Sequence, residues 1–103
     1  MSIVYSDEEQ KIVGEGTAAA ALLDNPIFLT AIEAIRAQCA EAILTSLPAD
    51  VQGREDAYSL SRALSAVTAE LGALASAAEA VEAQAQANTE YDVQPEADDE
   101  TDY

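Results

Sequence analysis

The side chains that perform most protein chemistry are nearly absent from this chain. Its 103 residues include no His and a single Cys, Cys39. General bases, nucleophile–base pairs and most zinc sites depend on His or on several Cys, so these classes of site are not expected. One Cys also cannot form an internal disulfide. We predict that Cys39 is a small buried side chain with a free thiol, which is typical of a reducing, intracellular setting.

The twenty Asp and Glu residues are the remaining candidates for chemistry. Glu79 and Glu82 are spaced one turn apart on a predicted helix, and Asp7 and Glu9 are close together in the N-terminal segment. Carboxylate pairs without His or an oxygen-rich ligand loop are ordinary features of a charged surface. Residues 92–102 are acidic but lack the Gly and the final Glu of a calcium-binding EF-hand loop. We therefore predict no catalytic residue, no metal site, no cofactor and no enzymatic activity.

Charge and hydropathy exclude further classes. Four Lys or Arg against twenty Asp or Glu give a formal net charge of -16, which opposes direct binding to nucleic-acid phosphates. No stretch approaches the roughly 18–20 apolar residues of a membrane span, so no membrane partner is expected. Residues 1–15 are acidic, so neither a secretory signal peptide nor a transit peptide is expected.

Composition divides the chain into three parts. Residues 1–16 are polar and acidic, which predicts a flexible N-terminal segment. Residues 17–87 are rich in Ala and Leu and strongly periodic, which predicts the folded helical domain. Residues 88–103 carry seven acids and no base, which predicts a flexible acidic tail because such a segment cannot offset its own ordering entropy.

The helical domain begins with a short predicted helix and continues with a longer one. Thr17 can cap the short helix, and Asn25-Pro26 marks the start of the longer one. Asn accepts hydrogen bonds from first-turn amides, and Pro fits the first helical position because its missing donor had no partner there. Apolar residues then recur every three or four positions as far as Leu47, and Pro48 predicts the end of this helix.

The clearest periodic signal lies in the last predicted helix, which Asp50 can cap and whose start Gly53 can delay by a few residues. Its apolar residues alternate steps of four and three over about three heptads, which is an a/d coiled-coil seam. Gly72 lowers the helix propensity near the middle of this helix, at a cost of about 1 kcal/mol. Either a close helix–helix contact requires a glycine there, or the helix tolerates the cost. The seam residues are Leu60, Leu64, Val67, Leu71, Leu74, Ala78 and Val81.

Two long helices joined by a short loop predict an all-α fold, namely an antiparallel helical hairpin. The alternative is a three-helix unit in which the short N-terminal helix packs on the hairpin. A lone hairpin of this size buries too little surface to be stable, so homo-oligomerisation or docking on a larger protein is expected. The predicted interface comprises Phe28, Ile32, Ile35, Leu60, Leu64, Val67, Leu71, Leu74 and Val81.

The acidic tail has two interpretations. It is either a solubilising tail or a ligand for a basic protein surface, because aromatic residues are interleaved with its acids. The acid excess also permits mimicry of nucleic acid, although the acids of the helical domain are sparse for a mimic. The predicted partner-binding residues of the tail are Tyr91, Asp98, Asp99, Glu100 and Tyr103.

The few basic residues include one next to the predicted loop. Arg54 can fix the loop through a salt bridge to Asp50 or to the opposing helix. The other interpretation is an exposed Arg that anchors a protein interface, where Arg is favoured.

Several short motifs occur in a fixed order over about residues 22–75: Asn25-Pro26-Ile27-Phe28, a helix with Ala31 and Ile35, Ala49-Asp50, Gly53-Arg54-Glu55, and then Leu60, Leu64 and Leu71. This order resembles a group of small tailed-bacteriophage proteins from the head and packaging gene region. The resemblance implies a virion component or packaging accessory in the bacterial host cytoplasm or the virion. It transfers no catalytic residues.

Together these features predict a non-enzymatic phage structural or assembly protein: a head, portal or DNA-packaging accessory. It would act through helix-mediated oligomerisation or by docking on a larger phage assembly. A small terminase is less favoured, because the basic residues of a DNA-binding helical element are missing. The alternative is an acidic inhibitor, a DNA-mimic-like decoy of a host nucleic-acid-binding or defence protein.

Overall fold

The protein is helical throughout the part of the chain that its structure describes. The computed structural model describes the backbone of residues 4–100 and the side chains of residues 4–88. Its helices are α1 (Asp7–Leu23), α2 (Pro26–Leu44) and α3 (Val51–Glu100). The predicted all-α fold is confirmed. α2 and α3 form the hairpin, and α1 packs on α3, which is the three-helix form of the prediction.

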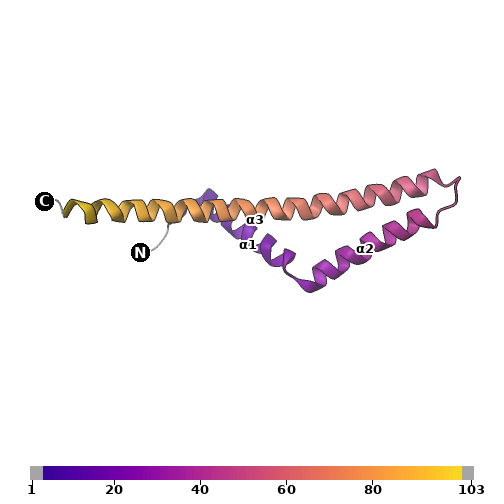
Figure 1. Cartoon of the computed structure of the whole chain (residues 1–103), viewed down its shortest axis with the longest axis horizontal. Coiled ribbons are helices and arrows are strands. Elements are labelled where there is room, and N and C mark those ends of the chain that lie inside the picture. The colour runs from indigo at the N-terminus through magenta and orange to yellow at the C-terminus, as the bar shows by residue number, and fades with distance from the viewer. Residues whose placement is uncertain (1–3, 101–103) are drawn as a thin grey trace.

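The molecule is long and thin. Figure 1 shows that α3 runs along nearly the whole length, while α1 and α2 form a bent arm that leaves α3 and returns to it at the loop. The bend between α1 and α2 is 65°. The molecule measures 83 × 22 × 22 Å, and its radius of gyration is 22.8 Å, against about 13 Å for a compact domain of this length. Much of each helix therefore faces away from the rest of the protein.

α1 starts eleven residues before the predicted short helix, because a capping box nucleates it. The Ser6 hydroxyl accepts a hydrogen bond from the Glu9 amide at 3.1 Å, and the Glu9 carboxylate accepts one from the Ser6 amide at 2.9 Å. This reciprocal pair satisfies amides that a helix end leaves without partners. The prediction that Thr17 caps this helix is therefore wrong, and residues 7–16 are helical.

α2 begins where the sequence predicts. The Asn25 side-chain oxygen accepts hydrogen bonds from the amides of Ile27 at 2.8 Å and Phe28 at 3.2 Å. Pro26 occupies the first helical position, where its missing donor costs nothing.

α2 ends three residues earlier than predicted, at Leu44 rather than Leu47. The Thr45 hydroxyl donates to the Glu41 carbonyl oxygen at 2.8 Å, which satisfies one of the carbonyls at the helix end. Side chains of this kind compete with the next helical turn, so the chain leaves the helix before Pro48.

α3 starts directly after its predicted cap. The Asp50 carboxylate accepts a hydrogen bond from the Gly53 amide at 3.0 Å, so Gly53 does not delay the helix. At its other end the helix continues to Glu100, and the predicted boundary at residue 87 is not a helix end. Elongation of a long helix adds one hydrogen bond per residue without a new nucleation cost, except at Pro95, which has no amide hydrogen to donate.

The buried core is very small and mostly made of small side chains. Among the described residues, the buried apolar side chains are Ala19, Ile32, Cys39 and Ala78. Cys39 is 4% exposed, which confirms the predicted buried thiol. Ile32 and Cys39 belong to α2, whereas Ala19 and Ala78 mark the place where α1 meets α3.

The contact of α1 with α3 depends on a glycine. A Cβ added to Gly16 would overlap the Cβ of Ala78 and lie 2.5 Å from the carbonyl oxygen of Leu74. Only Gly allows the two backbones to approach this closely. The close contact considered for Gly72 is absent, because a Cβ there would have no neighbouring atom within 4 Å.

Candidate functional site

The nine predicted interface residues divide between the inside of the monomer and its surface. Ile32 is buried, so it contributes to the fold of the single chain. Leu60 and Val67 are each 49% exposed, although they belong to the same seam as their neighbours. Phe28, Ile35, Leu64, Leu71, Leu74 and Val81 are half-buried between the helices.

The arm contacts α3 at two separate places. α1 packs on the part of α3 that contains Leu74 and Ala78, and α2 packs on the part that is closer to the loop. Figure 1 shows the arm leaving α3 between these two contacts. No single helix therefore covers the whole seam. Leu60 is half exposed although it lies beside α2, and Val67 is exposed to the same extent.

A hollow lies between α2 and α3 beside Leu60. Its volume is about 220 Å³. We call Leu60, Val67 and this hollow the open face. The hollow is lined by Ile35, Gln38, Cys39, Ala42, Asp56, Ala57 and Leu60.

Arg54 holds the loop between α2 and α3. Its guanidinium donates hydrogen bonds to the Leu47 carbonyl oxygen at 2.8 Å, the Pro48 carbonyl oxygen at 3.1 Å and the Ser46 hydroxyl at 3.0 Å. The prediction that Arg54 fixes the loop is confirmed, but its partners are these oxygens rather than the Asp50 carboxylate. Asp50 caps α3 instead.

A second cross-connection joins the two hairpin helices. The Arg36 guanidinium of α2 donates a hydrogen bond to the Ser65 hydroxyl of α3 at 3.2 Å. On the outer side of α3, the Arg62 guanidinium carbon lies 5.9 Å from the centre of the Tyr58 ring, within cation–π range. Two of the four basic residues therefore help to hold the hairpin, and a third rests on an aromatic ring.

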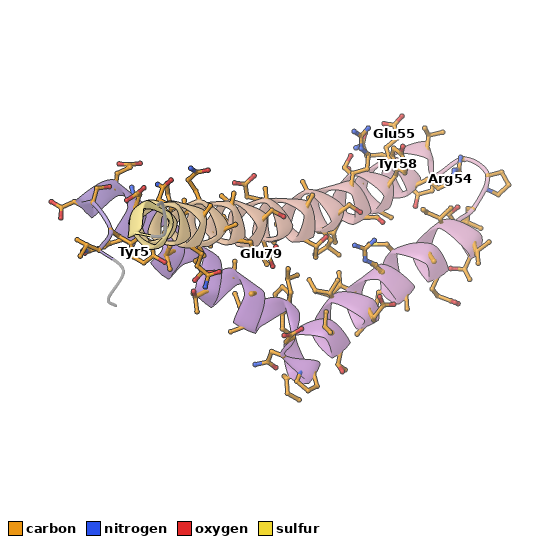
Figure 2. The ribbon with its side chains drawn as sticks, turned by 60° about the vertical axis from the view of Figure 1, so that its left-hand side comes forward. Tyr5, Arg54, Glu55, Tyr58 and Glu79 are labelled. Carbon is orange, nitrogen blue, oxygen red and sulfur yellow. The ribbon has the colours of Figure 1, made fainter. Side chains whose placement is uncertain are left out.

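Two further hollows lie at opposite ends of the molecule. One, of about 290 Å³ beside the loop, has Ile43, Val51, Arg54, Glu55 and Tyr58 in its lining. Figure 2 shows Glu55 and Tyr58 near the loop end of α3, and Ile43 of α2 lines the same hollow.

The other hollow, of about 530 Å³, has an acidic and polar lining. Figure 2 shows Tyr5 and Glu79 near each other on the same side of α3. Glu79, Glu82 and Asp7 are exposed, whereas Glu9 is half-buried and belongs to the cap of α1. The lining consists of Tyr5, Glu79, Glu82, Ala83 and Gln86.

Within residues 4–88, no group of three or more His, Cys, Asp or Glu side chains is placed to hold a metal ion. The five predicted partner-binding residues of the tail lie outside the residues whose side chains are described. The arrangement within these residues is one of open apolar and charged helix faces.

The sequence reasoning missed two features. The Gly16 contact was missed because Gly16 lies in a segment taken as flexible, although Gly16 and Ala19 are small residues three positions apart on one helix face. The hollow at Tyr5 was missed because no periodic pattern places the first residues beside α3. The Ser6-to-Glu9 capping signature was the available signal for both.

One helix meets the length and composition criteria of a membrane span. Residues Val51–Asn88 of α3 include a window with mean hydropathy 1.3, of which 6% is buried. The expectation that no stretch could qualify is therefore too strict, because it counted apolar runs and ignored the averaged hydropathy of many Ala residues. Glu70 opposes insertion, because an ionised side chain at the bilayer centre costs about 3 kcal/mol or more.

The comparisons with known proteins add no relative. No protein-family model matches this sequence, and neither the curated proteins nor the solved structures yield a match.

Proposed function

We propose that this chain is a non-enzymatic structural or assembly protein that acts by binding other proteins through its helices. The observation that carries the proposal is the open face, where Leu60 and Val67 remain half exposed on a heptad seam. Burial of apolar surface contributes about 25 cal/mol per Å², so a protein partner on this face adds stability that the small internal core does not supply.

The sequence resemblance supports a more specific role. The motifs from Asn25-Pro26 to Leu71 are similar to those of small proteins from the head and packaging region of tailed bacteriophages. We therefore propose a phage head, portal or DNA-packaging accessory that works in the bacterial host cytoplasm or the virion. Such a role needs binding surfaces and no catalytic group.

The placement of the acids favours a second candidate, an acidic decoy of a host nucleic-acid-binding or defence protein. Residues 4–25 and 67–88 together carry eight acids and one Lys. Tyr5, Glu79 and Glu82 surround the open hollow at this end of the molecule. Binding of this kind depends on charge, so high salt weakens it.

Paired variants separate the two candidates. Val67→Asp places a charge on the open face, whereas the double variant Glu79→Gln/Glu82→Gln removes charge at the acidic end. Val67 suits the test better than Leu64 or Leu71, because those two are half-buried within the monomer and a charge there would also disrupt the hairpin.

For each variant the absolute mass is measured by light scattering after size exclusion, at low and high salt. Binding to host proteins is measured by pull-down under the same two conditions. An assembly protein loses association with Val67→Asp and keeps it with the Gln pair and in high salt. If the Gln pair and high salt abolish binding while Val67→Asp has no effect, the result refutes the assembly function and supports the decoy function.

A further inference from the structure

We infer that the open face binds a second copy of the same chain in an antiparallel pair, with the two acidic ends pointing in opposite directions. The inference rests on the proposed function, association through the helices, and it names the partner and the surface. It follows from three observations: the amount of surface left exposed, the position of the apolar residues and the distribution of charge.

The exposed surface is large enough to form an interface. The chain has an accessible surface of 7397 Å², about a third more than the approximately 5,500 Å² expected for a compact monomer of 10.8 kDa. In a protein–protein interface of standard size, each partner buries about 800 Å². Pairing two copies through their hairpin halves therefore buries part of this excess surface.

The apolar residues available for such a contact follow one helix face. Leu60 and Val67 are spaced by seven residues, so they lie at the same heptad position on α3. Between Leu60 and α2 lies the hollow of about 220 Å³, whose lining includes Ile35 and Ala57. A groove beside a row of apolar residues accepts the equivalent row of another helix by knobs-into-holes packing.

Charge decides which halves of two copies can meet. Residues 26–66 carry three Arg and five acids, whereas the rest of the chain carries one Lys and fifteen acids. The hairpin half is thus close to neutral, and nearly the whole net charge of -16 belongs to the other half. Two copies can bring their hairpin halves together with little repulsion.

The same distribution selects the antiparallel arrangement. In a parallel pair, the two acidic ends would lie side by side, and like charges at short distance repel. In an antiparallel pair with two-fold symmetry, the same patch of both copies forms the contact and the acidic ends lie far apart. Salt screens the remaining repulsion, so higher ionic strength strengthens this dimer.

A lipid surface is a poorer occupant of this face. Asp56 lies in the lining of the hollow, and Glu70 follows Val67 by one turn. Insertion into hydrocarbon would bury both carboxylates, whereas at the rim of a protein interface they stay in contact with water.

The first test compares charges placed on and off the open face. Leu60→Asp and Val67→Asp change half-exposed residues of the open face. Ile27→Asp and Leu44→Asp are the matched controls, because these residues of α2 are more exposed, at 77% and 81%, and neither belongs to the open face. We expect the first two variants to halve the mass measured by light scattering and the two controls to leave it unchanged.

The second test measures direction. Ser76→Cys in a Cys39→Ala background provides one exposed labelling site on α3, and the mass of this variant is checked first. With a two-fold axis midway between Leu60 and Val67, a rise of 1.5 Å per residue places the two spin labels of an antiparallel dimer about 40 Å apart. In a parallel dimer, the separation is set by helix width and spacing and is about 25 Å or less.

Each other outcome overturns the inference in a recognisable way. A dimer with the short separation, or a mass above that of a dimer, excludes the antiparallel pair. A monomer at all concentrations that binds a different protein, and loses it with Val67→Asp, refutes the second copy but keeps the proposed function. If the unaltered chain floats with phosphatidylcholine vesicles and Val67→Asp abolishes this flotation, the open face binds lipid. That result refutes both the antiparallel dimer and the proposed function.

Discussion

At the scale of single residues, two glycines of similar sequence context have opposite structural roles. Gly16 lies where α1 meets α3, and Gly72 lies in a helix with open space around it. Sequence reasoning considered the wrong one, because periodicity shows which face of a helix is apolar but not where another helix crosses it. The position of a crossing depends on the bend of the arm, which is a property of the whole fold.

Substitution of each glycine by Ala tests this assignment. Gly16→Ala is expected to destabilise the fold by about 1–2 kcal/mol, because the added methyl overlaps Ala78 and the Leu74 backbone by more than the gain in helix propensity offsets. Gly72→Ala is expected to stabilise it by about 0.5–1 kcal/mol. Urea unfolding followed by circular dichroism measures both.

Gly14→Ala serves as the control on α1 itself, since a Cβ at Gly14 would have no neighbour within 4 Å. It is expected to behave like Gly72→Ala. Equal stabilisation by all three substitutions would show that α1 does not pack on α3 through Gly16.

For Arg54, the sequence predicts the role of the side chain but not its hydrogen-bond partners. The sequence indicates that a guanidinium beside the loop holds it, but not that carbonyl oxygens rather than carboxylates are its partners. Arg54→Ala removes three hydrogen bonds from a charged donor, so we expect a loss of about 1–3 kcal/mol in urea unfolding. Arg62→Ala, which removes one exposed cation–π contact, is expected to cost about 0.5 kcal/mol. A cost for Arg54→Ala no greater than that for Arg62→Ala would contradict the assigned role.

At the scale of elements, local signals predicted the starts of α2 and α3 but not the start of α1. Asn25-Pro26 and Asp50 mark the starts of α2 and α3 correctly. A capping side chain bonds an amide only two or three positions further along the chain, so the sequence alone identifies it. The end of α2 at Leu44 depends on hydroxyl groups that compete with one more helical turn. The continuation of α3 to Glu100 depends on the cooperativity of a long helix, which composition alone does not show.

The capping of α1 is tested by two substitutions, one at the observed cap, Ser6, and one at the cap expected from the sequence, Thr17. Ser6→Ala removes the cap and is expected to cost about 1 kcal/mol, which raises amide hydrogen exchange throughout the first turns of α1. Thr17→Ala changes the residue that sequence reasoning took as the cap, but Thr17 lies inside α1 and is exposed. It is expected to leave exchange in the first turns unchanged. Faster exchange with Thr17→Ala than with Ser6→Ala would contradict a helix that starts at Asp7.

At the scale of the whole molecule, the sequence predicts the seam but not its exposure. The heptad spacing from Leu60 to Val81 identifies apolar positions, and these positions do lie toward the other helices. The arm bends by 65° and meets α3 at two separate places, and Leu60 and Val67 on the seam are each 49% exposed. A sequence pattern contains no information on that bend beyond the break at Asn25-Pro26.

A protein whose fold is completed by a second copy unfolds at a temperature that depends on concentration. Binding to the folded state alone shifts the folding equilibrium by mass action. We expect the midpoint of thermal unfolding to rise by a few degrees for each tenfold increase in protein concentration, and to become independent of concentration in Val67→Asp. A midpoint that is constant in the unaltered chain would show that the monomer is stable without a partner.

The absolute mass of the unaltered chain in solution tests the central claim most directly. It is measured by light scattering after size exclusion over a range of concentrations, at low and at high salt. The account predicts twice the chain mass of 10.8 kDa, with the dimer retained or strengthened in high salt. A mass of one chain at every concentration and in both salt conditions would contradict the claim that a second copy covers the open face.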